Sequence, residues 1–197
     1  MPAAMLRLNV PLVLASRSPR RSALLKQIGL TFDVRPADTP EIWPEHASPG
    51  EAVEQIALEK VTATEAADAL VLGADTVVVL DGDVLGKPDD AEHASSMLRR
   101  LSGRTHIVYT GVALRYGTRE TTRHAATCVT FAEMADAEIA QYVAAAKPFD
   151  KAGAYGIQDD LGALLVARID GEYTNVIGLP LRTLYEALRS DFSDLLL

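Results

Sequence analysis

The pattern of apolar positions divides the chain into strands and helices that follow one another in mixed order. Short β-branched runs predict strands at 10–16, 31–36, 105–117 and 121–134, a strand pair at 69–80 and a hairpin over 162–178. Apolar stripes bounded by capping residues predict helices at about 19–28, 49–67, 89–103, 136–146 and 179–192. Because several strands are adjacent hairpins, we expect an α/β fold with a mixed sheet flanked by helices.

The first predicted helix starts with an unusual group of charges. Ser18 and Pro19 are typical of an N-cap and a first helical position. Arg17, Arg20 and Arg21 surround this start, although a helix N-terminus carries positive partial charge and disfavours cations. An anion between them would explain the group, because backbone N–H groups and guanidinium groups both bind phosphate. A solvated surface cluster is the alternative interpretation.

Composition narrows the class of protein. Of the 197 residues, 48% are apolar, and there is no apolar run of the roughly 18 residues that a transmembrane helix needs. The net charge of −8 argues against a general nucleic-acid binder and makes the arginine group stand out. The single cysteine, Cys128, excludes an internal disulfide, and the N-terminal pattern does not match a secretory signal. We therefore expect a cytoplasmic protein.

Two charged residues interrupt apolar patterns. Lys60 falls in the middle of the apolar stripe of the 49–67 helix, where its ammonium group either reaches the surface or meets an anion in a cleft. Asp75 lies where two apolar runs of the 69–80 segment meet. It is either a turn residue at a strand end or a catalytic group at the edge of the sheet.

Two glycine-containing segments are candidates for ligand contact. "GDVLGKP" is not a P-loop, because three residues separate Gly82 from Gly86 and Pro88 replaces the required Ser or Thr. Lys87 therefore either touches phosphate as a point charge or lies exposed in a tight turn. The segment "FDKAGAYGIQDD" lets the backbone approach a ligand closely, or simply connects two elements.

The remaining reactive side chains give weaker signals. The four histidines show no spacing typical of metal ligands, and His93 and His106 are most simply surface residues. Cys128 lies in a predicted strand without a candidate base beside it, so we do not expect a nucleophile.

Seven short motifs together carry a resemblance that no one of them would carry alone. They are LASRSPRRSALL, EK at 59–60, GADT, LGKP, LSGRTH, DKAGAYGIQ and NVIGLPL. In this order and spacing, over about residues 10–188, the sequence resembles the Maf family of nucleoside triphosphate pyrophosphatases, once called septum formation proteins.

The resemblance implies a fold and an activity. The expected fold is a mixed, twisted sheet flanked by helices, with two lobes around a cleft, similar to the inosine triphosphate pyrophosphatases and spanning residues 1–197 as a single domain. The expected activity is hydrolysis of a nucleoside triphosphate to the monophosphate and pyrophosphate, with Mg²⁺ or Mn²⁺ as cofactor. A homodimer is a further family expectation.

The matched motifs also imply roles for particular residues. Asp75 matches the catalytic proton acceptor, and Asp75 with Glu41 is the candidate metal ligand set, although a metal-bound carboxylate is a poorer base. The motifs and the available cations give these substrate-binding residues: Ser16, Arg17, Arg20, Arg21, Lys60, Thr76, Lys87 and Gln158.

Three of these residues match the branch of the family that acts on dTTP and UTP rather than on 7-methyl-GTP. They are Arg20, Thr76 and Gln158. The amide of Gln158 offers one acceptor and one donor, which suits the N3–H and carbonyl edge of uracil or thymine. The alternative explanation for Thr76 is the preference of threonine for strands. Asp159 and Asp160 depart from the motif, and the resemblance assigns them no role.

Two other functions compete with this interpretation. The first is a nucleotide-binding regulator of cell division that keeps the phosphate motifs but has little turnover. The second is a pyrophosphatase with another nucleotide specificity. A nucleic-acid-binding module is the least favoured, because the chain is acidic and lacks aromatic stacking platforms.

Overall fold

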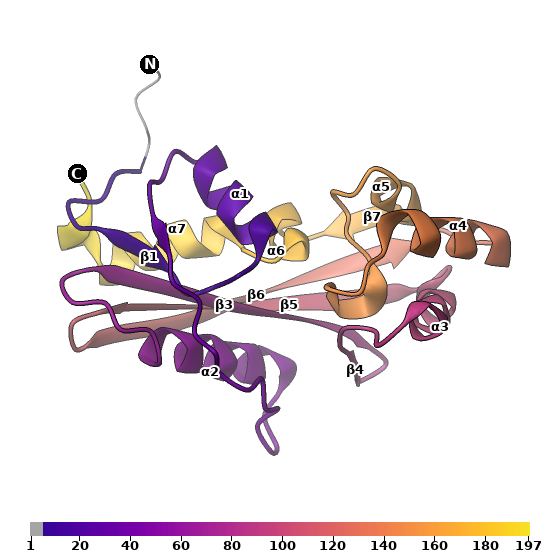
Figure 1. Cartoon of the computed structure of the whole chain (residues 1–197), viewed down its shortest axis with the longest axis horizontal. Coiled ribbons are helices and arrows are strands. Elements are labelled where there is room, and N and C mark those ends of the chain that lie inside the picture. Colours follow the sequence, from indigo (N-terminus) through magenta and orange to yellow (C-terminus); the bar gives the residue numbers. More distant parts are fainter. Residues whose placement is uncertain (1–5) are drawn as a thin grey trace. The chain divides into compact units, whose positions relative to one another are not determined.

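The computed structural model describes residues 6–197, which contain one seven-stranded mixed sheet. The strand order is β2-β1-β3-β5-β6-β7, with β4 paired to β3 (Figure 1). Strand β1 runs parallel to β2 and β3, whereas β4 on β3 and β7 on β6 are antiparallel, which confirms the predicted mixed sheet. The strands are β1 (Leu12–Leu14), β2 (Asp33–Val34), β3 (Leu70–Leu80), β4 (Asp83–Leu85), β5 (Thr105–Tyr116), β6 (Arg119–Phe131) and β7 (Val166–Asp170).

The five predicted helices are all present, with shorter bounds at several ends. The helices are α1 (Pro19–Gln27), α2 (Pro49–Thr62), α3 (Ala91–Leu101), α4 (Asp136–Ala146), α5 (Gly162–Leu165), α6 (Tyr173–Ile177) and α7 (Leu181–Asp191), with 3-10 turns η1 (Ala152–Ala154) and η2 (Ser193–Leu195). Ser18 caps α1 by accepting a hydrogen bond from the backbone N–H of Arg21. Ser48 and Glu51 form a full capping box on α2, as the Ser-Pro start predicts. Among residues 6–197, no helix combines the length and the apolar character needed to cross a bilayer.

Two strand predictions were wrong in detail. Segment 69–80 is one continuous strand rather than a pair, and its partner β4 follows a turn at residues 81–82. Segment 162–178 is not a hairpin, because helices α5 and α6 flank the single strand β7. The second half of this segment contains helix α6, and the side chain of Thr127 holds two polar groups at its start, the backbone N–H of Glu172 and the side-chain amide of Asn175. Thr127 Oγ1 accepts hydrogen bonds from Glu172 N and Asn175 Nδ2, at 3.0 and 2.9 Å.

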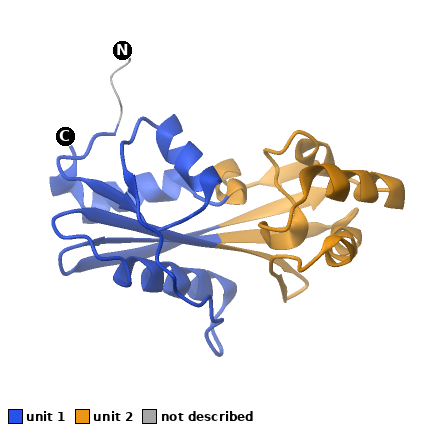
Figure 2. Cartoon of the chain, viewed as in Figure 1, with its two compact units in different colours: residues 1–75, 110–125, 178–197 blue, residues 76–109, 126–177 orange. Residues whose placement is uncertain are grey.

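The chain divides into two compact units, coloured separately in Figure 2. Unit 1 consists of the described residues up to Asp75 together with Thr110–Ala125 and Gly178–Leu197. Unit 2 consists of Thr76–Tyr109 and Ala126–Ile177. The prediction of a single domain stays a prediction.

Unit 1 packs helices on both faces of its part of the sheet. Figure 1 shows α1 and α7 on one face and α2 on the other. Glycines let α2 approach closely. A Cβ at Gly73 would lie 2.7 Å from the carbonyl oxygen of Ala57, and one at Gly111 would lie 2.3 Å from that of Val53. Since real Cβ atoms do not come this near to backbone, glycine at both positions sets the distance between α2 and the strands.

Unit 2 has its own apolar core, and this core contains His106. The ring is 1% exposed, so the prediction of a surface histidine was wrong. His106 Nε2 lies 2.8 Å from Tyr155 Oη, and its ring meets Phe131 edge to face. The residue lies on β5 with its side chain on the core face, which the apolar pattern of a 12-residue strand did not distinguish from the exposed face. Helix α3 completes this unit by packing against α4 and η1.

Candidate active site

A buried lysine joins two carboxylates in unit 1. Lys60 Nζ lies 2.7 Å from Asp75 Oδ1 and 2.8 Å from Glu41 Oε1. The side chains of Lys60 and Asp75 are 10% and 9% exposed, whereas that of Glu41 is 45% exposed. The structure therefore excludes the interpretation in which Lys60 reaches the surface. Its ammonium instead contacts two anionic groups of the protein itself.

Asp75 lies inside a strand, not at its end. It is in the middle of β3, a strand between β1 and β5, so it is neither a turn residue at a strand end nor at the edge of the sheet, and its catalytic role stays a prediction. A buried carboxylate within a strand needs a partner, because burying an unpaired charge is costly. Gly73, two residues earlier on β3, permits the close approach of α2, and α2 carries that partner, Lys60.

Arg21 is held by protein oxygens near this ion pair. Its Nε donates to the carbonyl oxygen of Gly178 at 2.8 Å, and its Nη1 donates to Ser16 Oγ at 3.0 Å. Burial lowers the pKa of the Arg21 guanidinium, and the nearby carboxylates of Asp75 and Glu41 oppose that shift. Ser16 Oγ also accepts from the backbone N–H of Ser18, at 3.2 Å, so it ties Arg21 to the start of α1.

The three arginines therefore have different environments. Arg21 is bonded inside the protein, and the charge of half-buried Arg20 contributes to the lowered pKa of Arg21. Arg17 is 72% exposed and lies 3.7 Å from Asp38, an exposed pair of the kind that contributes little to stability. The side chain of Arg21 makes two hydrogen bonds to protein oxygens, and the predicted phosphate contacts of all three arginines stay predictions.

The remaining predicted residues belong to unit 2. Thr76 follows Asp75 on β3 and is half-buried, while Lys87 is exposed in the loop after β4 and Gln158 is exposed after η1. The backbone N–H of Gly153 donates to the carbonyl oxygen of Gly86 at 3.0 Å. This bond joins the loop that carries Lys87 to the glycine-rich segment that leads to Gln158.

Sequence reasoning gave no role to Asp159, which the structure places beside Gln158. Asp159 Oδ1 accepts a hydrogen bond from Gln158 Nε2 at 3.3 Å, and Asp159 Oδ2 accepts one from Tyr142 Oη at 3.3 Å. Lys151 Nζ lies 3.4 Å from the same carboxylate. The signal in the sequence was the departure from the motif after "GIQ", where an acid follows the glutamine directly.

A divalent metal fits the carboxylates of unit 1 only with help from further ligands. Glu41 and Asp75 are hard oxygen donors that already converge on one cation, the Lys60 ammonium. Within residues 6–197, no group of three or more His, Cys, Asp or Glu side chains is arranged to hold a metal. Mg²⁺ is commonly bound by one or two carboxylates plus substrate phosphates, so this donor set suits a metal that arrives with a nucleotide.

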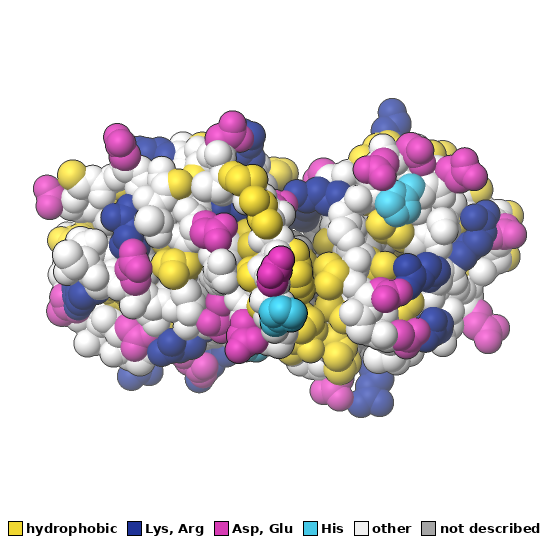
Figure 3. Space-filling model, turned by 90° about the horizontal axis from the view of Figure 1, so that it is seen from below, with side chains coloured by type: hydrophobic (Ala, Val, Ile, Leu, Met, Phe, Trp, Pro, Cys, Tyr) yellow, Lys and Arg dark blue, Asp and Glu magenta, His cyan; other side chains and the backbone are white. Residues whose placement is uncertain are grey.

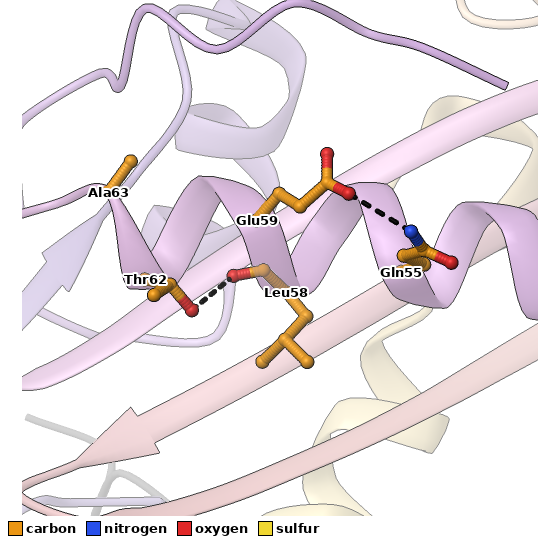
Figure 4. Close-up of a pocket in the computed structure, with 5 residues that line it drawn as sticks. All are labelled: Gln55, Leu58, Glu59, Thr62 and Ala63. Atoms are coloured by element: carbon orange, nitrogen blue, oxygen red, sulfur yellow. Dashed lines mark hydrogen bonds between the residues drawn. The ribbon is translucent and has the colours of Figure 1, made fainter. Parts of the chain in front are cut away.

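One pocket of unit 1 lies away from the predicted site residues. A pocket in unit 1 is lined by Gln55, Leu58, Glu59, Thr62 and Ala63, all from α2 or the residue after it, and contains none of the predicted site residues (Figure 4). Figure 3 shows acidic and basic side chains interspersed over one face of the molecule, rather than a continuous basic surface there.

Comparison with known proteins decides the family. The profile of the Maf family, described as "Maf-like protein", matches residues 11–191. This chain belongs to the Maf family. Three similar curated proteins, each named dTTP/UTP pyrophosphatase, come from Salinibacter ruber, Moorella thermoacetica and Symbiobacterium thermophilum. They are 48%, 54% and 50% identical, covering 98%, 90% and 90% of this chain and 96%, 93% and 92% of their own lengths.

Membership of the Maf family confirms the resemblance drawn from the seven motifs. The α/β fold with its mixed sheet is consistent with it. The roles of individual residues are a separate matter, because a match to the family does not test them.

Proposed function

We propose that this Maf-family chain hydrolyses dTTP and UTP to the monophosphate and pyrophosphate. Relatives that are about half identical over nearly their whole length carry the name dTTP/UTP pyrophosphatase. Arg20, Thr76 and Gln158 match the pattern of that branch. The observation that carries the proposal is the buried pair of Asp75 and Lys60 beside Arg21, since it places a carboxylate among cations.

In the proposed reaction, a water molecule attacks the α-phosphorus. Asp75 orients this water and accepts its proton. A bond forms between the water oxygen and the α-phosphorus, while the bond to the oxygen that bridges the α- and β-phosphorus breaks and pyrophosphate leaves with the electron pair. Phosphoryl transfer relies on positioning and charge neutralisation. The positive charge is supplied by Arg17, Arg20, Arg21, Lys60 and Lys87.

The proposed cofactor is Mg²⁺ or Mn²⁺. Asp75 and Glu41 would hold the metal together with phosphate oxygens of the substrate, because Mg²⁺ is commonly bound by one or two carboxylates plus substrate phosphates. When bound, the metal supplies positive charge against the triphosphate. Lys60 already shows that the two carboxylates can share one cation.

The proposed base recognition uses the Gln158 amide. Its oxygen accepts from the N3–H of uracil or thymine, and its nitrogen donates to a neighbouring carbonyl oxygen of the base. Gln158 is exposed and therefore accessible to a ligand.

We also propose a cytoplasmic location, which the single cysteine supports. The homodimer stays a prediction.

A substrate panel tests the reaction. Purified protein is incubated with each common NTP and dNTP and with 7-methyl-GTP, in Mg²⁺ or Mn²⁺, and the products are identified. We expect pyrophosphate and monophosphate, released chiefly from dTTP and UTP. Release of orthophosphate would contradict the proposed bond cleavage, and a preference for 7-methyl-GTP would contradict the proposed branch.

The variant Asp75→Asn separates the enzyme from the regulator. The amide cannot accept the proton, so we expect kcat to fall by about 10²-fold or more, as for other removed general bases. Nucleotide binding should persist or tighten, because one negative charge near the phosphates is gone. A wild-type protein that binds nucleotides without hydrolysing them would favour the regulator of cell division instead.

A further inference from the structure

Gln158 and Asp159 are adjacent in sequence, and their side chains interact. Gln158 Nε2 donates to Asp159 Oδ1 at 3.3 Å. An ionised carboxylate can only accept hydrogen bonds, so only the NH₂ end of the amide can face it. The contact therefore sets which way round the Gln158 amide is held. It leaves the amide oxygen and the second N–H for other partners.

Asp159 is itself fixed in place. Its Oδ2 accepts from Tyr142 Oη at 3.3 Å and lies 3.4 Å from Lys151 Nζ. Its backbone closes a turn, because its N–H donates to the carbonyl oxygen of Gly156 at 3.0 Å and its own carbonyl oxygen accepts from Gly162 N at 2.9 Å. The side chain is only 22% exposed. Two side chains contact the carboxylate and the turn fixes its backbone, so its position does not depend on Gln158 alone.

The surroundings also explain how an acid is tolerated here. Lys151 contacts Asp150 at 3.0 Å as well as Asp159, and its own side chain is 12% exposed. A cation between two carboxylates offsets their charge in a partly buried place. A Cβ at Gly156 would lie 2.7 Å from Asp159 Oδ2, so glycine at that position leaves room for the carboxylate.

We propose that Asp159 is a positioning residue that selects uracil and thymine against cytosine by fixing the orientation of the Gln158 amide. This inference rests on the proposed function, in which Gln158 contacts the base. Uracil and thymine present an N3–H donor between two carbonyl acceptors. An amide whose NH₂ end lies on Asp159 offers its oxygen to N3–H and its second N–H to a carbonyl.

Cytosine presents the opposite pattern at two of these three atoms. Its N3 is an acceptor and its neighbouring amino group is a donor, so pairing with Gln158 would require the amide to turn over. The turned amide would bring its oxygen against the Asp159 carboxylate, and two acceptors would then face each other with no proton between them. Unmade hydrogen bonds of this kind are costly, so cytosine nucleotides are disfavoured.

The variant Asp159→Asn tests the proposal. An asparagine of the same shape can donate or accept, so it accepts either orientation of the Gln158 amide. We expect the ratio of kcat/KM for UTP to that for CTP to fall roughly tenfold, mainly through a gain for CTP. Asp160→Asn is the matched control, because it removes the same charge from the next, exposed residue, and its ratio should equal that of the wild type.

The ratio of kcat/KM for UTP to that for CTP distinguishes a positioning role of Asp159 from a purely structural one. If Asp159 only closed the turn, Asp159→Asn would lower kcat/KM for UTP and CTP equally and leave their ratio unchanged, which would overturn the inference. Asp159→Ala is a second test in case Asp159→Asn folds poorly. Its ratio of kcat/KM for UTP to that for CTP should also fall. If the wild type prefers UTP and both Asp159 variants keep the wild-type ratio of kcat/KM for UTP to that for CTP, this inference is wrong, but the proposed function stands. A wild-type protein that hydrolyses neither nucleotide contradicts the proposed function as well.

Discussion

Lys60 occupies a position on α2 where the apolar stripe predicts an apolar side chain. The structure explains the exception, since Asp75 on β3 is just as deeply buried and the two are 2.7 Å apart. Glu41 adds a second, more exposed contact at 2.8 Å. Each of the two buried charges would be costly without the other, because an unpaired buried charge is strongly destabilising.

Replacing Lys60 by methionine should therefore destabilise the protein strongly. Lys60→Met leaves Asp75 buried without its partner, and breaking a buried pair in this way costs about 3–5 kcal/mol in the free energy of unfolding. Urea denaturation measures the change. The double variant Lys60→Met/Asp75→Leu, which removes both charges, should recover most of the loss. If it were as unstable as the single variant, the ion pair would not be the cause.

His106 predicts a pH dependence of stability. Burial lowers the pKa of its imidazole from 6.5 to about 4, so the folded protein keeps the ring neutral while the unfolded chain protonates it below about pH 6.5. Stability is thus fully present above pH 6.5 and declines as the pH falls towards 4. The loss amounts to about 3 kcal/mol if this histidine acts alone.

The control for this prediction is His106→Gln, which keeps a side-chain amide near Tyr155 Oη but cannot titrate. The free energy of unfolding is measured by urea denaturation at several pH values between 4 and 7. The variant should show a shallower decline than the wild type over that range. Parallel curves for the two proteins would assign the decline to other groups.

At the scale of elements, the distance between α2 and β3 sets the site in unit 1. Gly73 permits that distance, because a Cβ there would lie 2.7 Å from the carbonyl oxygen of Ala57 and 2.8 Å from Val61 Cγ1. The added atom would also lie 3.4 Å from Lys60 Cβ. A change on β3 would therefore be transmitted directly to the helix that carries the lysine.

Gly73→Ala should lower both stability and activity. Overpacking of this kind costs about 1–3 kcal/mol, and a displaced α2 should weaken the contact of Lys60 with Asp75 and reduce kcat. Gly86→Ala is the matched control for stability, because a Cβ there meets nothing within 4 Å. Denaturation and steady-state kinetics are the measurements. A Gly73→Ala protein as stable as Gly86→Ala would show that the helix does not need this approach.

The elements were largely predictable from the sequence, and the exceptions have physical causes. Caps such as Ser18 and Ser48 marked helix starts because their chemistry is local. The turn at Glu172 and Asn175 was not predictable, because its helical form depends on Thr127, a residue more than 40 positions away. The same holds for the burial of His106, which depends on Phe131 and Tyr155.

Fewer features of the candidate site than of the fold were predictable from the residues alone. Lys60 and Asp75 stood out as charges within apolar patterns, and their pairing agrees with that signal. The motif match supplied most of the other residues, and their roles stay predictions. Arg21 could not be distinguished from Arg17 and Arg20 by sequence, because its hydrogen bond to Gly178 joins opposite ends of the chain.

At the scale of the whole molecule, an acidic net charge coexists with a local group of cations in unit 1. The net charge is −8, yet Arg20, Arg21 and Lys60 lie around the carboxylates of unit 1. An acidic protein with a local group of cations disfavours extended nucleic acid but can still bind a small phosphate ester.

Hydrolysis in water enriched in oxygen-18 tests the central claim most directly. The protein is incubated with UTP and a divalent metal, and the products are analysed by mass spectrometry, with Asp75→Asn as the control. If water attacks the α-phosphorus, one labelled oxygen should appear in UMP and none in the pyrophosphate, and the variant should give almost no product. Label in the pyrophosphate, or release of orthophosphate, would contradict the account.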